Sequence, residues 1–227
     1  MRLDKYLSNA NIASRKDVKK LIKQQRVEVN GVCAKKPDMN VEYSDKIFVD
    51  GDPIELKEHL YLLFYKPAGY ICANYDKLHK TIFDILDHPQ KDELQICGRL
   101  DMDVTGLVVL TNDGQFNHLL TTPKKGHYKE YIVTFEGSTM GLETEYPNGI
   151  ILENDNEYHT RPFHIEVKNA DTLHIFVTEG RYHLVKNIIS ELGLKLTHLH
   201  RVKVGPYHLP NDMVGLRYRF SACRQKI

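Results

Sequence analysis

Residues Gly98–Gly114 read GRLDMDVTGLVVLTNDG, and this stretch constrains the fold and the chemistry of the chain more than any other. Asp101 lies between two glycines, Gly98 and Gly106, and the apolar run Leu107–Leu110 follows. Glycine lets the backbone turn sharply on either side of the aspartate, and the apolar run indicates a buried strand. We therefore expect a loop that holds the Asp101 carboxylate at the mouth of an apolar pocket, with a nearby cation that keeps it ionised.

Two further interpretations of this loop are compatible with the residues alone. Asp101 could cap a turn and pair with Arg99, which precedes it by two positions. Asp101 and Asp103 could also act as a pair of carboxylates, one acid and one base, in a hydrolase of the glycosidase kind. The short Arg-x-Asp-x-Asp pattern does not by itself distinguish these alternatives from a single catalytic carboxylate.

Outward from this loop, strand patterns outnumber helical ones, and short turns often join neighbouring strands. This order predicts an α+β domain in which helices pack against a largely antiparallel or mixed sheet. We expect strands over Leu60–Tyr65, Leu107–Leu110, Tyr128–Glu136, Glu157–Val167, Thr172–Val177, Lys195–Val204 and Leu216–Phe220, and helices over Thr81–Leu86, Gln115–Thr121 and Tyr182–Leu192.

The first fifty residues have a different pattern, two short helices followed by a hairpin. Apolar spacing predicts helices over Leu3–Ala10 and Arg15–Gln25, and the Ser14 hydroxyl can cap the second helix by accepting a first-turn N–H. Asn30-Gly31 predicts a tight hairpin turn. We expect strands over Val27–Val29, Val32–Ala34 and Lys46–Val49.

Basic residues gather at both ends of the chain, although the formal net charge is only +1. Residues 1–36 hold ten Lys or Arg against three Asp or Glu, and residues 181–227 hold nine against two. On the helix expected over Arg15–Gln25, basic residues recur four positions apart, a spacing at which like charges repel by a few tenths of a kcal/mol. The pattern could be an ordinary solvated face, but a helix that accepts such repulsion favours a polyanionic partner.

Composition excludes several classes of protein. The chain has 227 residues, 41% of them apolar and 27% charged, with a mean hydropathy of −0.43, which is typical of a globular protein of one or two domains. No apolar run approaches the ~18 residues of a membrane span, and the N-terminus lacks the pattern of a leader peptide. Four scattered cysteines without a CxxC pair argue against a disulfide framework or a zinc knuckle. We therefore expect a cytoplasmic protein that does not enter a membrane.

Four segments near the N-terminus resemble the S4 RNA-binding domain, a small domain of the alpha-L type, in its own order: RLDKYL (Arg2–Leu7), SRKDVKKLI (Ser14–Ile22), VEVNG (Val27–Gly31) and DKIFVDG (Asp45–Gly51). The resemblance implies an RNA-binding domain over residues 1–52, followed by a linker over residues 53–59. In S4 domains the two helices present basic side chains to the backbone of structured RNA, and phosphate contacts of this kind carry no sequence information. The residues that match are Arg2, Lys5, Arg15, Lys16, Lys19, Lys20 and Lys35.

The rest of the chain resembles the RsuA-type family of RNA pseudouridine synthases, which carry an S4 domain before the catalytic domain. Gly98–Gly114 is similar to the family's catalytic motif, and the resemblance spans residues 60–227. Four further segments agree with the family in order: YKPAGYICANYD (Tyr65–Asp76), KEYIV (Lys129–Val133), EGRYHLVKNII (Glu179–Ile189) and LHRVKVG (Leu199–Gly205).

The resemblance implies an isomerase that breaks the N1–C1′ bond of a uridine in RNA, turns the uracil within the pocket and joins C5 to C1′. It implies no cofactor and no metal. Asp101 matches the catalytic carboxylate, which acts as nucleophile or as base, and Asp103 and Asp113 are expected to be structural. Tyr131 matches a tyrosine that stacks on the uracil. Lys186 matches a basic residue that pairs with the catalytic aspartate, and Arg99 would fill the gap left by the displaced base.

The histidines His183, His198 and His200 could be taken for metal ligands because two of them alternate on a strand. No third ligand of suitable spacing accompanies that pair, so we expect His183 and His200 to be pocket walls or supports.

Within the family, the forms of Tyr65–Asp76 and Glu179–Ile189, with lysine at 186, resemble the branch that modifies 16S rRNA of the small subunit at uridine 516. This implies rRNA as the partner, either naked or in a partly assembled small subunit, and we expect the protein to be a monomer. The alternatives are a synthase that acts on 23S rRNA or tRNA, or an S4 protein that binds RNA without catalysis.

Overall fold

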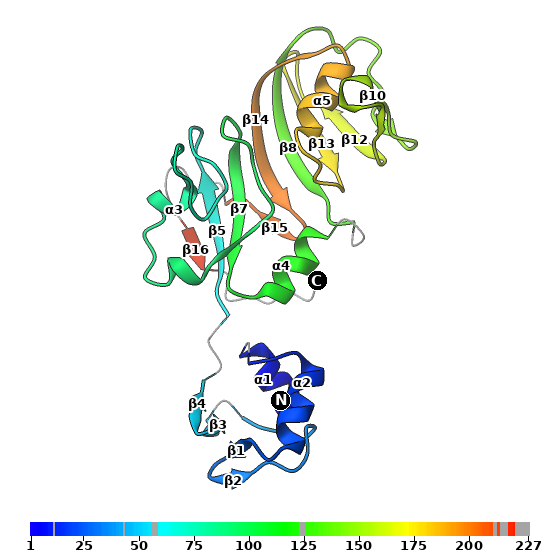
Figure 1. Cartoon of the computed structure of the whole chain (residues 1–227). Coiled ribbons are helices and arrows are strands. Elements are labelled where there is room, and N and C mark those ends of the chain that lie inside the picture. The colour runs from blue at the N-terminus through cyan, green and yellow to red at the C-terminus, as the bar shows by residue number, and fades with distance from the viewer. Residues whose placement is uncertain are drawn as a thin grey trace. The chain divides into compact units, whose positions relative to one another are not determined.

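The computed structural model describes residues 1–10, 12–42, 44–55, 59–122, 126–210, 213 and 218–220, the last three by their backbone. The chain divides into two compact units, Met1–Glu58 and His59–Ile227, drawn in Figure 1. No helix in the described ranges is long and apolar enough to cross a membrane. We describe each unit by itself.

The smaller unit packs two helices against a four-stranded antiparallel sheet of order β2-β1-β3-β4. Its elements are α1 (Leu3–Asn9), α2 (Arg15–Lys23), β1 (Val27–Val29), β2 (Val32–Cys33), β3 (Ile47–Val49) and β4 (Asp52–Ile54). Ser14 caps α2 as predicted, because its hydroxyl accepts a hydrogen bond from the Asp17 N–H at 3.2 Å. Asn30 and Gly31 both have positive φ and form the predicted turn between β1 and β2. Leu3, Leu7, Val18, Ile22, Val27 and Ile47 form the buried core.

β4 lies in the stretch where the sequence placed the end of the S4 domain and the linker. Asp52–Ile54 pairs with β3 instead, with Pro53 opposite Phe48. β4 is the edge strand of its sheet, and proline is tolerated there because the outer side of an edge strand needs no N–H donor. The ordered part of the smaller unit therefore extends beyond residue 52.

The larger unit is built on a mixed sheet of ten strands, with main order β16-β5-β7-β14-β8-β13-β12-β9. β6 and β15 pair with β7 and β14, and only the β7–β14 pair is parallel among the described strands. The larger strands are β5 (Tyr61–Lys66), β7 (Thr105–Thr111), β8 (Lys129–Glu136), β12 (Phe163–Val167), β13 (Thr172–Val177) and β14 (Lys195–Val204). The smaller strands of this sheet are β6 (Gln95–Cys97), β9 (Glu145–Tyr146), β15 (Tyr207–His208) and β16 (Tyr218–Phe220). A separate two-stranded sheet is formed by β10 (Ile151–Leu152) and β11 (Tyr158–His159).

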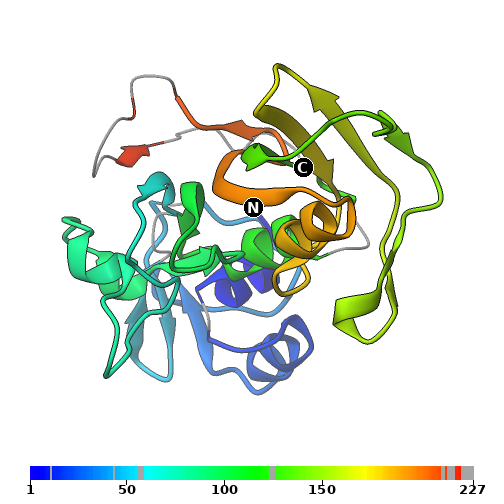
Figure 2. The same cartoon turned by 90° about the horizontal axis from the view of Figure 1, so that it is seen from above.

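Helices cover both faces of this sheet. α4 (Gly114–Thr121) contributes Phe116 and Leu120 to the core on one face, and α5 (Leu184–Glu191) packs Ile188 and Ile189 into the core on the other. Figure 1 and Figure 2 show α5 from two sides. A further short helix, α3 (Ile82–Ile85), begins with a capping box between Thr81 and Asp84. The predicted α+β fold is confirmed.

Several predicted elements differ from the observed ones by one or two residues at an end, and two larger differences have a cause in the backbone. The helix expected over Tyr182–Leu192 begins at Leu184, because His183 adopts the left-handed conformation with φ 53° and cannot continue a helix backward. The stretch Glu157–Val167 divides into β11 and β12, which pair with different neighbours. Leu216 and Arg217, at the start of the last predicted strand, lie outside the described residues.

The parallel contact between β7 and β14 requires a glycine. Gly106 lies opposite Arg201 in the register and has φ +114°, and a Cβ at this position would lie 2.2 Å from the Arg201 carbonyl oxygen. Real Cβ atoms do not approach backbone so closely, so any side chain here forces the two strands apart.

We predict that Gly106→Ala lowers the free energy of unfolding by roughly 3 kcal/mol, because the clash involves backbone that cannot move aside. Gly141→Ala is the matched control, since Gly141 also has positive φ but a Cβ there meets nothing within 4 Å. This control should cost roughly 1 kcal/mol, the strain of a left-handed alanine. Denaturant unfolding of the full chain measures both variants, and equal losses would contradict the role assigned to the strand contact.

Candidate active site

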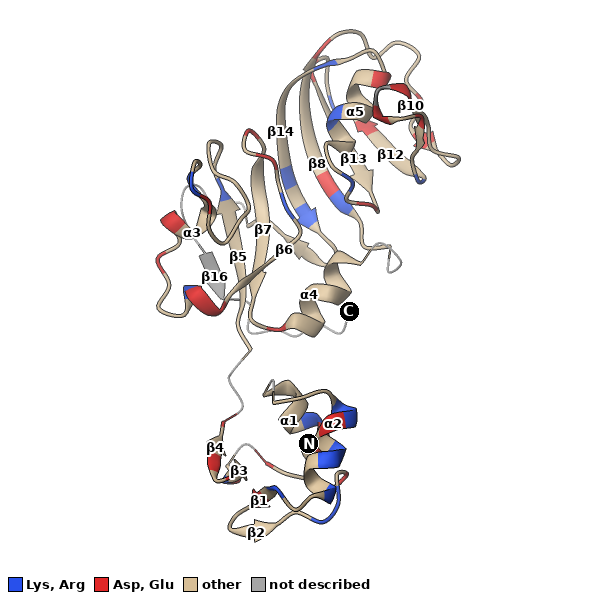
Figure 3. Ribbon diagram, viewed as in Figure 1, with Lys and Arg blue, Asp and Glu red and all other residues tan. Residues whose placement is uncertain are grey.

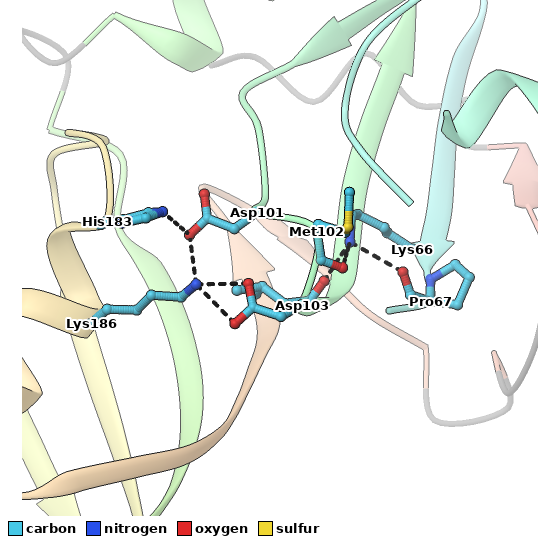
Figure 4. A network of polar contacts seen from close by, with 8 residues as sticks. Lys66, Pro67, Asp101, Met102, Asp103, His183 and Lys186 are labelled. Atoms are coloured by element: carbon cyan, nitrogen blue, oxygen red, sulfur yellow. Dashed lines mark hydrogen bonds and ion pairs between the residues drawn. The ribbon is translucent and has the colours of Figure 1, made fainter. Parts of the chain in front are cut away.

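A buried lysine holds the loop that carries Asp101. Lys66, the last residue of β5, is completely buried, and its Nζ donates to the carbonyl oxygens of Pro67 at 3.1 Å, Met102 at 3.2 Å and Val104 at 2.6 Å. These contacts are drawn in Figure 4. Burial lowers the pKa of Lys66 to about 8, so the ammonium and its three hydrogen bonds persist at neutral pH. Two carbonyls of the loop are thus tied to the end of a core strand.

Hydrogen bonds with three more residues, Gly69, Cys72 and Arg201, fix the same loop. The Gly69 N–H donates to the Met102 carbonyl at 2.8 Å, and the Leu100 N–H donates to the Cys72 sulfur at 3.3 Å. Arg201, only 1% exposed, donates from Nη1 to the Arg99 carbonyl at 3.3 Å and from Nε to the Leu107 carbonyl at 2.8 Å. The position of Asp101 is therefore set by backbone contacts from β5, the segment after it, and β14.

Lys186, in the first turn of α5, lies between two carboxylates. Its Nζ is 3.2 Å from Asp101 and 2.7 and 2.9 Å from the two oxygens of Asp103, as Figure 4 shows. Burial lowers the pKa of Lys186, but the hydrogen bonds with Asp103 and Asp101 outweigh it and raise the pKa above the ordinary value. Burial raises the pKa of Asp103, but the Lys186 hydrogen bond, a backbone hydrogen bond and the charges of Lys186 and His183 together outweigh it, so that pKa is lowered. Lys186 is therefore positively charged, and the carboxylates of Asp101 and Asp103 share it as a counter-ion.

The sequence paired Lys186 with Asp101 alone and assigned Asp103 a structural part. The ion pair with Asp101 is present, but the Asp103 contact is shorter and bidentate. His183 adds a second contact to Asp101, with Nε2 at 3.4 Å from the carboxylate. Asp101 is 29% exposed, so it stands at the mouth of a pocket and is not sealed inside it.

Asp101, Arg99, Tyr131 and Lys186 all line one pocket of about 690 Å³. Tyr131 projects from β8 and is 8% exposed, and its hydroxyl makes no hydrogen bond with a described residue. Arg99 is exposed at the rim and forms no ion pair with Asp101 in the described part of the chain. The pocket brings together all four residues that the sequence singled out for chemistry.

The loop over residues 178–183 lines one side of this pocket, and contacts with residues outside the pocket hold it in place. Arg181 pairs with Asp155 at 2.5 Å and lies 4.1 Å from the centre of the Tyr158 ring. The Tyr158 hydroxyl donates to Glu179 at 2.6 Å. Between these anchors Tyr182, 70% exposed, stacks on the His183 ring with centroids 3.7 Å apart.

His198 and His200 do not reach the pocket. Alternate residues of β14, Leu199 and Arg201, line it, while both histidines meet the Thr105 hydroxyl, at 3.2 and 2.8 Å. His183 lines the pocket as expected, whereas His200 is not a pocket wall, because a strand sends neighbouring side chains to opposite faces. Among the described residues no group of three or more His, Cys, Asp or Glu could hold a metal ion.

The basic surface expected on the smaller unit is present on its helices, as Figure 3 shows for α2. All seven predicted residues, Arg2, Lys5, Arg15, Lys16, Lys19, Lys20 and Lys35, are exposed. Arg2 and Arg15 each lie 3.0 Å from Asp4, whose side chain is 1% exposed, and Lys20 pairs with Asp17 at 2.8 Å. The Arg2 hydrogen bond, opposed by burial and aided by Arg15, lowers the pKa of Asp4 to about 2. Part of the repulsion predicted along α2 is therefore relieved by these carboxylates.

Comparison with known proteins gives the same division of the chain. Residues 60–213 match the sequence profile of a family described as RNA pseudouridylate synthase, and residues 1–47 match the S4 domain. The chain belongs to the RNA pseudouridylate synthase family. It therefore isomerises uridine to pseudouridine within RNA, and the predicted enzyme class is confirmed.

Similar proteins within this family match almost the whole chain. The ribosomal small subunit pseudouridine synthase A of Pasteurella multocida (strain Pm70) is 35% identical over 96% of this chain and 95% of its own length. The protein of the same name from Vibrio parahaemolyticus is 37% identical over 97% of this chain and 95% of its own length. A pseudouridylate synthase crystal structure, 32% identical, aligns with a TM-score of 0.68 over 97% of this chain and 96% of that one.

The sequence patterns did not single out several charged residues of this synthase site. Lys66, Lys129, Glu179 and Arg201 are all buried near the pocket, yet they lie within the quoted motifs. The available signal was a charged residue inside a strand pattern, such as Lys66 directly after the apolar run Tyr61–Tyr65. Such a residue is either exposed or held by specific partners, and sequence alone does not distinguish the two.

We predict that Lys186→Met lowers pseudouridine formation by about 100-fold, because two neighbouring carboxylates lose their shared cation. Lys186→Arg keeps the charge and is the control. Single-turnover rates across pH measure the effect, and a Lys186→Met enzyme within tenfold of the wild type would contradict it.

We also predict that Lys16→Gln with Lys19→Gln weakens RNA binding and lowers the slope of log affinity against log salt by about 1 to 2, through loss of phosphate contacts. Both lysines are exposed and form no ion pair with a described residue, so the fold should be unaffected. Lys195→Gln, which removes an exposed lysine paired with Glu136 in the larger unit, is the control. An unchanged salt slope in the double variant would exclude this face as the RNA surface.

Proposed function

We propose that this synthase converts one uridine of 16S rRNA, the uridine at position 516 in the usual rRNA numbering, to pseudouridine. Two relatives named for the small ribosomal subunit, cited above, align with both units of the chain at 35% and 37% identity. The S4 unit matches a domain that binds RNA, and its helices carry an exposed basic surface. Small-subunit RNA, naked or in a partly assembled particle, is the substrate that these features favour.

One observation carries the chemical part of the proposal: Asp101 stands in the pocket mouth within 3.4 Å of two potential cations, Lys186 and His183. An ionised carboxylate in this position can approach C1′ of a ribose whose base enters the pocket. It then acts as nucleophile at C1′ or as base on the sugar. In either case the N1–C1′ bond breaks and C5 joins C1′, and the proton lost from C5 is balanced by the one gained at N1.

The remaining pocket residues supply binding and orientation. The Tyr131 ring forms a pocket wall on which a flipped uracil can stack. Its hydroxyl can accept the proton that leaves C5 and pass it on. Arg99 at the rim is placed to enter the space that the base leaves in the RNA. Asp103 positions Lys186 rather than acting on substrate.

We propose that the protein acts as a monomer in the cytoplasm, since Asp101, Tyr131 and Lys186 of one chain already line a common pocket. The S4 unit supplies affinity through phosphates, which does not select a sequence. Selection of the target uridine then falls to the RNA shape that both units bind and to the pocket that receives the base.

The decisive experiment maps pseudouridine in rRNA from cells with and without the gene, and then with Asp101→Asn in its place. We predict that the 16S signal at uridine 516 disappears in both the deletion and the variant, while the purified variant binds RNA within about threefold of the wild type, because only the catalytic charge is lost. A signal lost instead from 23S rRNA or tRNA would overturn the proposed target. An abasic product, seen as a mass change, would indicate a hydrolase.

A further inference from the structure

Lys129, the first residue of β8, is a buried cation that the chemistry above leaves unused. It lines the pocket on the same face of the strand as Tyr131, two residues on, and is only 8% exposed. Its ammonium forms no hydrogen bond or ion pair with any described residue. Burying an ammonium without a partner costs several kcal/mol, so the fold retains this charge at a cost that a ligand in the pocket would recover.

The surroundings of Lys129 do not supply that partner. Arg201, on the neighbouring strand β14, adds a second positive charge. The carboxylate of Glu179 already accepts hydrogen bonds from the Tyr158 hydroxyl at 2.6 Å and the Arg161 N–H at 2.9 Å. Gly180 lies next to the Lys129 side chain, because a Cβ at position 180 would be 4.0 Å from the Lys129 Nζ. Burial and the charge of Arg201, opposed by Glu179, lower the pKa of Lys129 to about 8. The side chain is thus protonated at neutral pH.

The depth of Lys129 within the pocket decides which part of the RNA can reach its ammonium. Exposure decreases inward from the rim, where Tyr182 is 70% exposed, through Asp101 at 29%, to Lys129 at 8%. Phosphates are fully charged and hydrated and remain at the surface, whereas a flipped base enters the enclosed part of such a pocket. The groups of uracil that accept hydrogen bonds from an ammonium are its carbonyl oxygens O2 and O4.

Building on the proposed function, we infer that the Lys129 ammonium donates to a carbonyl oxygen of the flipped uracil and stabilises the negative charge that the base gains in the reaction. When the N1–C1′ bond breaks, its electron pair stays with uracil and spreads from N1 to O2 and O4. At the same time C1′ bonds to the Asp101 carboxylate, or C2′ loses a proton to that carboxylate and forms a double bond to C1′; either change is reversed when C5 attacks C1′. The charge disappears when C5 bonds to C1′ and the C5 proton is replaced by one at N1. Lys129 therefore acts only while uracil is detached.

The test compares Lys129→Met, Lys129→Arg and the wild type on RNA from cells that lack the gene, so that whichever uridine the wild type modifies is the substrate. Removal of one such donor typically slows the chemical step by about 100-fold, and we expect this loss in the single-turnover rate of Lys129→Met, with RNA affinity unchanged. Its melting temperature should be no lower than that of the wild type, because the variant no longer buries an unpaired charge. Lys195→Met is the control, because this exposed lysine of β14 pairs with Glu136 and does not line the pocket.

The pH profile separates this role from a structural one. Lys66 and Lys129 both have a pKa of about 8, and Lys66 is present in every variant, so the pH profiles are compared as ratios. The rate of the wild type relative to Lys129→Arg should fall as pH rises through about 8, because Lys129 loses its proton whereas guanidinium stays charged. A Lys129→Met rate within threefold of the wild type, a loss confined to RNA affinity, or a ratio of wild type to Lys129→Arg that does not change with pH would each overturn the inference. Absence of 16S modification by the wild type would overturn the proposed target only.

Discussion

The close approach of β7 and β14 at Gly106 and Arg201 is the contact on which the catalytic unit depends. It is the parallel pair at the centre of a sheet whose other described neighbours are antiparallel, and it joins segments nearly a hundred residues apart. Because glycine permits the contact, β14 lies directly beside the strand that follows the Asp101 loop. Arg201 can then reach the carbonyls of Arg99 and Leu107 on either side of that loop. The same placement puts β8, and with it Tyr131, next in the sheet.

The pocket that results has more cations than carboxylates. Its lining holds five cations, Arg99, Lys129, Arg181, Lys186 and Arg201, against the three carboxylates of Asp101, Asp103 and Glu179. An excess of positive charge in a partly enclosed site favours the ionised form of a carboxylate and attracts an anionic polymer from a distance. It also suits a reaction in which a neutral base becomes transiently anionic. Lys66 differs from these cations, since its three carbonyl contacts make it part of the loop's support.

The sequence predicted elements whose signals are local. The Ser14 cap, the Asn30-Gly31 turn and the strands around Leu107–Leu110 depend on nearest neighbours, and they formed as expected. The start of α5 and the pairing of β4 could not be predicted from the sequence, because tertiary packing decides the left-handed conformation of His183 and the edge position of Pro53. The four residues expected to carry the chemistry came from motif resemblance, and they do share one pocket. Their spacing along the chain alone could not have placed them together.

The sharing of Lys186 shows why a motif does not fix a geometry. A motif match identifies Asp101 and Lys186 as partners, but the side chain that holds the ammonium most tightly is Asp103, at 2.7 and 2.9 Å. Asp103 is largely exposed, so its contribution to folding stability is small, as for other surface ion pairs. Its effect is instead to fix where the ammonium stands: with Nζ held by both carboxylates, Asp101 keeps its counter-ion without being drawn deeper into the pocket. The carboxylate thus remains at the mouth, where a ribose attached to an RNA backbone can meet it.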